Sequence, residues 1–127
     1  MEAHQYLADI KSRLIASPAI ATFTITEELD LSDRGYFRAR VTLINSDFLE
    51  IAEYFVIISD VATTTRYRYQ WMDNDRKNLC KRWDNVPHFP SLPNFPHHIH
   101  VKSEENVISG RALNIQELID TLEQEVI

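Results

Sequence analysis

Apolar and polar residues alternate along three segments of the chain, at residues 22–26, 36–44 and 63–72. A longer, mostly apolar segment covers residues 48–58, and a short one covers 78–84. An alternation with a period of two places every second side chain on the same face of a β-strand. Short polar turns separate these segments, and such turns join neighbouring strands that run antiparallel. The chain is therefore predicted to form an antiparallel β-meander of about five strands.

Two amphipathic helices are predicted, one before and one after these strands. Residues 2–16 repeat apolar side chains at helical spacing and are followed by Pro18, which ends a helix because the residue before a proline avoids the helical conformation. Residues 114–126 show the same spacing, with Asn114 and Glu117 placed to form a capping box. The result is an α+β fold of a single domain, residues 1–127, with both helices packed on one face of the sheet. That face is expected to carry Phe37, Val41, Tyr67, Tyr69 and Trp71.

The composition excludes several classes of protein. No apolar run reaches the roughly 18 residues that a membrane-spanning helix needs, so we expect no membrane partner, and a single cysteine excludes a disulfide scaffold. The first residues lack the pattern of a secretory signal, so we expect a cytoplasmic protein. The net charge of −6 argues against tight, non-specific binding of nucleic acid. Residues 34–101 nevertheless carry nine basic and seven acidic residues, which favours a local phosphate site there.

The sheet face opposite the helices is predicted to be cationic. Its expected arginines are Arg38, Arg40, Arg66, Arg68 and Arg82. Guanidinium groups on neighbouring strands lie close enough to repel one another, so they need a counter-anion. A bound phosphate or carboxylate would supply it, because the planar guanidinium group pairs with either. The alternative is an internal lattice of ion pairs with Glu50, Glu53 and Asp84. Glu50 and Glu53 face opposite ways in a regular strand, unless a bulge intervenes.

Four of the five histidines lie within thirteen residues, around a proline-rich segment at 85–96 that is predicted to be an extended loop. They are His88, His97, His98 and His100. In a short strand at 98–101, His98 and His100 point the same way and His97 points the opposite way. Imidazole suits proton transfer near neutral pH. A second interpretation is a metal site of His98, His100 and either His88 or Asp84. The third is that the rings form only structural hydrogen bonds.

Three groups of residues together resemble a known family. The first is Glu53-Tyr54-Phe55 with Tyr67-Arg68-Tyr69-Gln70-Trp71, the second is Arg82-Trp83-Asp84-Asn85-Val86-Pro87-His88, and the third is Phe95-Pro96-His97-His98-Ile99-His100. Over essentially the whole chain they are similar to the TumE family, small prokaryotic proteins described as toxin components of toxin–antitoxin systems. The chain departs from the expected pattern at Phe89, where a second histidine would follow His88. The resemblance implies a partner antitoxin of the helix-turn-helix type.

The expected activity is that of a metal-independent ribonuclease that uses no cofactor. A helix on an antiparallel meander is similar in architecture to ribonucleases of the barnase–RelE type. Their reaction needs a base for the 2′-hydroxyl, an acid for the leaving oxygen and cations for the charge on phosphorus. Two alternatives stay open. One is a non-catalytic module that binds a protein or an anion on the arginine face, and the other is a metal-dependent phosphodiesterase. The open edges of a meander also allow a homodimer.

Each candidate residue has an expected role in RNA cleavage. The catalytic residues are His88, His98 and His100, and the phosphate-binding residues are Arg66, Arg68 and Arg82. Asp84 would orient an imidazole, or would only pair with Arg82. Tyr67 or Trp83 would stack on a base if either ring were exposed, although the alternation places both toward the core.

Overall fold

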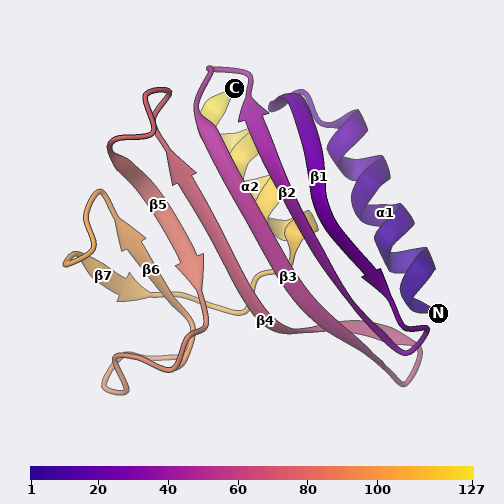
Figure 1. Cartoon of the computed structure of the whole chain (residues 1–127). Coiled ribbons are helices and arrows are strands. Elements are labelled where there is room, and N and C mark those ends of the chain that lie inside the picture. The colour runs from indigo at the N-terminus through magenta and orange to yellow at the C-terminus, as the bar shows by residue number, and fades with distance from the viewer.

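Seven strands form one antiparallel sheet in which neighbours in the sheet are also neighbours in the chain (Figure 1). The computed structural model describes all 127 residues. In chain order the elements are α1 (Ala3–Ala16), β1 (Ile20–Asp30), β2 (Arg34–Leu43), β3 (Phe48–Ile58), β4 (Val61–Met72), β5 (Leu79–Asp84), β6 (His98–Val101), β7 (Val107–Ser109) and α2 (Ile115–Val126). The predicted α+β meander is therefore present. β1 and β7 form its two open edges, and the homodimer stays a prediction.

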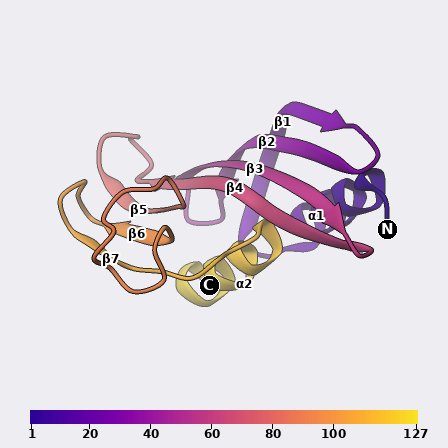
Figure 2. The ribbon, with the colours of Figure 1, turned by 90° about the horizontal axis from the view of Figure 1, so that it is seen from below.

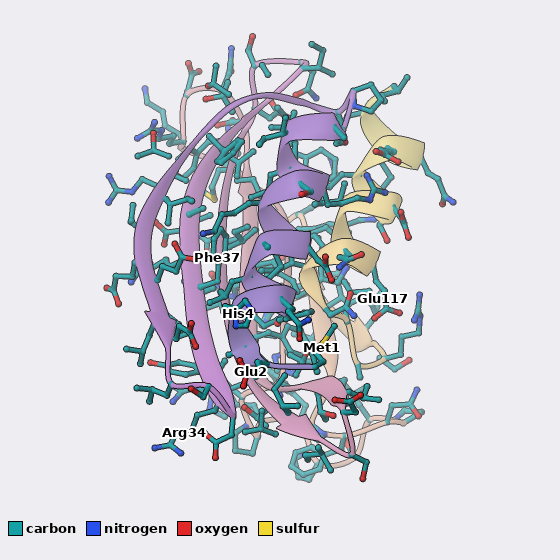
Figure 3. All side chains as sticks on the ribbon, turned by 90° about the vertical axis from the view of Figure 1, so that its right-hand side faces the viewer. Met1, Glu2, His4, Arg34, Phe37 and Glu117 are labelled. Carbon is teal, nitrogen blue, oxygen red and sulfur yellow. The ribbon has the colours of Figure 1, made fainter.

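Both helices lie on the same side of the sheet (Figure 2). In Figure 1, α1 runs beside β1, and α2 is seen behind β2 and β3. Figure 3 shows the two helices side by side, with Phe37 of β2 between the sheet and α1. Their apolar residues pack with the strands in one cluster of 21 buried side chains, which forms the core. The opposite side of the sheet has no helix on it.

The helix ends follow the predicted signals. The side chain of Asn114 accepts a hydrogen bond from the Glu117 amide at 2.8 Å, and the Glu117 carboxylate accepts one from the Asn114 amide at 3.2 Å. This capping box satisfies amide groups that the first helical turn leaves free. α1 ends at Ala16, before Ser17 and Pro18, as expected.

The pairing register assigns each strand residue to a face. Phe37, Glu53 and Tyr67 are directly opposite one another on β2, β3 and β4, and all three are buried on the helix side. The other side, called the outer face below, carries Tyr36, Arg38, Arg40, Glu50, Ala52, Tyr54, Arg66, Arg68, Gln70, Arg82, Asp84, His98 and His100. All five predicted arginines are on this face.

Two expectations about the strands need correction. The sheet has seven strands rather than about five, because β6 joins it and β7 adds a strand of only three residues, too short for an alternation to be visible. The first strand extends to Asp30 instead of ending at Thr26. Its second half is acidic and exposed, and a register shift separates it from the first half, so its composition resembles that of a loop.

One carboxylate lies inside the core and joins four elements. Glu53 on β3 is fully buried. Its side chain accepts hydrogen bonds from the Tyr6 hydroxyl of α1 at 2.6 Å and from the backbone amide of Ile115, the first residue of α2, at 3.0 Å. The Tyr69 hydroxyl of β4 lies 3.1 Å from the same carboxylate and 2.9 Å from the carbonyl of Leu113. Glu53 is therefore a structural residue and does not neutralise the arginines of the outer face.

Replacing Glu53 by alanine is expected to lower the free energy of unfolding by about 3 kcal/mol, because buried donors lose their acceptor and a cavity opens. Glu50→Ala is the matched control on the same strand. Its ion pairs with Arg38 and Arg40 are partly exposed, and surface pairs of this kind are worth at most about 1 kcal/mol. Urea denaturation compares the two variants, and equal losses would contradict the structural role of Glu53.

The same carboxyl group is expected to make stability depend on pH. Burial raises the pKa of Glu53 above its ordinary value of 4.5 and outweighs the hydrogen bonds, which act in the opposite direction. Above pH 4.5 the unfolded chain loses this proton before the folded protein does, so the contribution to stability falls as the pH rises toward the folded pKa. The variant Glu53→Gln does not titrate. Its free energy of unfolding relative to the unaltered protein should therefore rise between pH 4.5 and 7 in denaturant titrations, whereas a constant difference would contradict the raised pKa.

Candidate functional site

Three neighbouring strands carry the candidate site on the outer face. Arg68 of β4 lies opposite Asp84 of β5, and Asp84 lies opposite His98 of β6. The adjacent row consists of Gln70, Arg82 and His100. Side chains that are directly opposite on neighbouring strands are close together, so the register gathers guanidinium, carboxylate and imidazole groups in two adjacent rows. His98 and His100 point to this side as predicted, and His97 points to the helix side.

Asp84, His98 and His100 form a buried cluster. Their nearest ligand-type atoms all lie within 4.8 Å of one another. The Nε2 atom of His98 is 3.0 Å from Asp84 Oδ1, and the Nε2 atom of His100 is 3.8 Å from Asp84 Oδ2. All three residues are buried. Asp84 therefore lies close to both imidazoles, as a residue that orients an imidazole must.

Backbone carbonyl groups set the tautomer of both rings. The Nδ1 atom of His98 is 2.9 Å from the carbonyl oxygen of Pro96, and the Nδ1 atom of His100 is 2.9 Å from that of Glu104. A carbonyl oxygen only accepts, so each Nδ1 carries a hydrogen and donates it. Each neutral ring then presents the lone pair of Nε2 to the inside of the cluster.

Arg82 is engaged in ion pairs and is not free for a ligand. Its Nε atom donates to Asp84 Oδ2 at 3.3 Å, and its two terminal nitrogens donate to the carboxylate of Glu104, one of them at 2.7 Å. These contacts raise the pKa of Arg82 and lower that of Glu104, chiefly through their shared hydrogen bonds. Asp84 therefore pairs with Arg82, which is the structural role considered for it, and it also lies beside the imidazoles.

A cavity of about 310 Å³ opens over the cluster. It is bounded by Arg68, Arg82, Asp84, Val86, His88, Phe89, His98, His100 and Glu104. The imidazoles that follow the proline-rich loop thus share one pocket with two of the predicted arginines. His88 is exposed in this pocket, and the ring of Phe89 contacts those of His98 and His100 edge-on, at centroid distances of 5.2 and 6.0 Å.

The arginines of the outer face fall into two groups. Arg38 and Arg40 both pair with Glu50, at 2.9 and 3.5 Å, so this half of the face is neutralised internally, as the ion-pair alternative proposed. Arg66 and Arg68 are exposed and pair with no carboxylate, and Arg68 donates only to Gln70, at 2.7 Å. The uncompensated charge is therefore beside the histidine pocket.

Tyr67 and Trp83 are not available to stack on a base. Both are buried on the helix side, with 3% and 5% of their surface exposed. The Tyr67 hydroxyl is 3.0 Å from Nδ1 of His97 and 3.3 Å from the carbonyl of Arg111, and burial raises its pKa well above the ordinary value. The alternation correctly placed both rings in the core, so the stacking role does not apply to them.

A different pair of tyrosines occupies the outer face. Tyr36 and Tyr54 are directly opposite on β2 and β3, with ring centroids 4.2 Å apart, and 47% of Tyr54 is exposed. A second cavity of about 220 Å³ lies beside them and is lined by Arg66 and Arg68, so Arg68 borders both cavities. The alternation of 36–44 places Tyr36 on the arginine side, which is the signal that could have identified it.

The fold and the pocket define an α+β protein whose open sheet face combines imidazole, carboxylate and unpaired guanidinium groups. The chain belongs to the TumE toxin family, since the model of that family, described as Toxin TumE, matches residues 10–127. Membership identifies a toxin of a toxin–antitoxin system, which implies an antitoxin partner. The comparisons found no matching curated protein and no matching solved structure. Neither helix combines the length and apolar character needed to cross a membrane.

Proposed function

We propose that the protein acts as a toxin by cleaving RNA in the outer-face pocket. The observation that carries this proposal is the meeting of three histidines with an unpaired arginine in one cavity, formed by β4, β5, β6 and the loop before β6. RNA supplies its own nucleophile in the 2′-hydroxyl group, so a protein needs only to bind the phosphate, move protons and stabilise charge. The pocket contains a group for each of these tasks.

The proposed reaction is an internal transfer at phosphorus. The 2′-oxygen forms a bond to phosphorus while the bond to the 5′-oxygen breaks, giving a 2′,3′-cyclic phosphate and a 5′-hydroxyl group. One proton leaves the 2′-hydroxyl and one is delivered to the 5′-oxygen, so the proton count balances. His88 is the exposed imidazole of the pocket and is proposed to transfer protons, and the buried His98 and His100 line the same cavity. Arg68 is placed to offset the additional negative charge on the phosphate.

The outer face also offers a path for a single RNA strand. Arg66 and Arg68 lie between the histidine pocket and the tyrosine pair, and neither is neutralised by a carboxylate. An exposed aromatic ring binds an unpaired base by stacking, which double-stranded RNA does not permit. The proposed substrate is therefore single-stranded RNA, with one base on Tyr54 and the next phosphates on the two arginines. Arg82 is proposed to position Asp84 and not to bind phosphate.

The variants Arg68→Ala and His88→Ala are expected to lower the rate of RNA cleavage on the order of 100-fold, because each removes a group that contacts the phosphate or transfers a proton. Both residues are exposed, so the thermal midpoint should stay nearly unchanged. Cleavage of a defined single-stranded RNA by the purified protein measures the rate. Inhibition of growth on expression should fall in parallel, and co-expression of the proposed helix-turn-helix antitoxin should restore growth with the unaltered toxin.

Arg34→Ala and His4→Ala are the matched controls, since both residues are exposed and lie outside the pocket. They should keep full cleavage. Growth inhibition by the unaltered protein without any cleavage of RNA would reject the ribonuclease and favour a module that acts by binding. Loss of cleavage in the controls as well would show that the activity does not reside in the pocket.

Replacing Tyr54 by leucine should weaken binding of single-stranded RNA by about 1–3 kcal/mol, the usual contribution of one stacked base. The side chain is half exposed, so the fold should tolerate the change. Fluorescence anisotropy with a labelled oligonucleotide measures the affinity, and Tyr54→Phe serves as the control because it retains the ring. If leucine and phenylalanine bind RNA equally well, Tyr54 does not stack on a base.

A further inference from the structure

We infer that Asp84, His98 and His100 form a binding site for a divalent transition-metal ion at the floor of the pocket. The inference starts from an unsatisfied group. Only 2% of His98 is exposed, and its buried Nε2 atom has no hydrogen-bond partner. A buried polar atom without a partner costs about 1–3 kcal/mol, so its place beside a carboxylate and a second imidazole needs an explanation.

The direction of the two rings supplies that explanation. Nδ1 of each ring donates to a backbone carbonyl, so in the neutral form of the rings the Nε2 lone pairs of His98 and His100 both face Asp84. A neutral imidazole offers the carboxylate no hydrogen there, and the 3.0 Å contact between His98 Nε2 and Asp84 Oδ1 does not have the angles of a hydrogen bond. Three electron-pair donors thus converge on one point, as they do around a cation.

The spacing of the donors fits a metal ion. Zinc binds imidazole nitrogen and carboxylate oxygen at about 2.0–2.2 Å, which puts neighbouring ligand atoms of a tetrahedral site about 3.3 Å apart. The distances of 3.0 and 3.8 Å from Asp84 to the two rings bracket this value. Two histidines at positions i and i+2 of one strand and an aspartate on its neighbour supply three ligands from a rigid sheet.

The surroundings of the cluster also match those of metal ligands. Ligating imidazoles usually donate their second nitrogen to a carbonyl or a carboxylate, and ligating carboxylates accept further hydrogen bonds. Here Pro96 and Glu104 provide the carbonyls, while Arg82 Nε and the Val86 amide donate to Asp84 at 3.3 and 3.1 Å. These contacts hold all three side chains in place and leave the Nε2 atoms of His98 and His100 unused. Each oxygen of Asp84 accepts one of these bonds and keeps a second lone pair for an ion.

Two nitrogen ligands and one oxygen ligand favour ions such as Zn²⁺, Mn²⁺ or Co²⁺ over Mg²⁺ and Ca²⁺, which prefer oxygen alone. Arg68 lines the same cavity as the three ligands, so a phosphate held by this arginine would lie near the ion. This inference deepens the proposed function and rests on it for the use of the ion, which would polarise a phosphate oxygen or activate the nucleophile. It favours the metal-dependent alternative over the metal-independent one, with Asp84 and not His88 as the third ligand, and it leaves His88 as the imidazole of the pocket that transfers a proton.

The test measures metal binding directly. Protein stripped with a chelator is titrated with Zn²⁺ by calorimetry, and Co²⁺ is used as a spectroscopic probe. We expect one ion per chain and a rise in the thermal midpoint, because an ion that binds only the folded state stabilises it. Asp84→Asn, His98→Gln and His100→Gln should each weaken binding on the order of 100-fold. His88→Ala and His4→Ala are the controls and should bind as the unaltered protein does.

Several results would overturn the inference. One is that the protein does not bind a stoichiometric amount of metal. The others are that all three ligand variants still bind it, or that the control variants His4→Ala or His88→Ala lose binding. Because the ligands are buried, circular dichroism first checks that each variant is folded. If a variant does not fold, Co²⁺-induced shifts of imidazole signals in the unaltered protein decide the matter, since only those of His98 and His100 should move strongly.

Failure of the inference and failure of the proposed function are distinguishable. Stoichiometric binding without RNA cleavage keeps the metal site and rejects the ribonuclease. Cleavage that persists in the chelator, together with no stoichiometric binding, keeps the ribonuclease and rejects the metal site. Cleavage that is lost in the chelator and returns with Zn²⁺ or Mn²⁺ supports both.

Discussion

The carboxylate of Glu53 holds the helices to the sheet, and the position of the site depends on that attachment. It accepts hydrogen bonds from the hydroxyl of Tyr6 in α1 and from the first amide of α2, so one side chain joins both helices to strand β3. A buried carboxylate is tolerated only where several donors compensate for the loss of water. With both helices bound to this side, the opposite side has no helix covering it and carries the candidate site.

The candidate site has a buried part and an exposed part. Asp84, His98 and His100 lie at the bottom, where neighbouring backbone groups and Arg82 hold them in place. Arg66, Arg68 and His88 lie exposed above and beside them. The groups held by many hydrogen bonds are thus buried, and the charged groups without a carboxylate partner are exposed. Arg66 and Arg68 remain without a carboxylate partner although the net charge of the chain is −6.

Sequence patterns predicted the features that depend on neighbours in the chain. Alternation placed Tyr67 in the core, Arg68 on the outer face and His98 on the same side as His100, and the signals at Asn114 and Glu117 marked the start of α2. Features that depend on pairing between strands were left as alternatives, such as Asp84 beside an imidazole, or were not predicted. The contact of Asp84 with the imidazoles requires the register of β5 against β6, and thirteen residues of loop separate those strands. The Tyr36–Tyr54 pair likewise requires the register of β2 against β3.

β5 connects the core with the candidate site. On this strand Trp83 enters the core and the next residue, Asp84, enters the pocket. Inserting or deleting one residue within β5 would exchange the two sides, exposing an indole and burying a carboxylate among apolar groups. Such a change in the length of β5 would therefore disturb the core and the pocket at the same time.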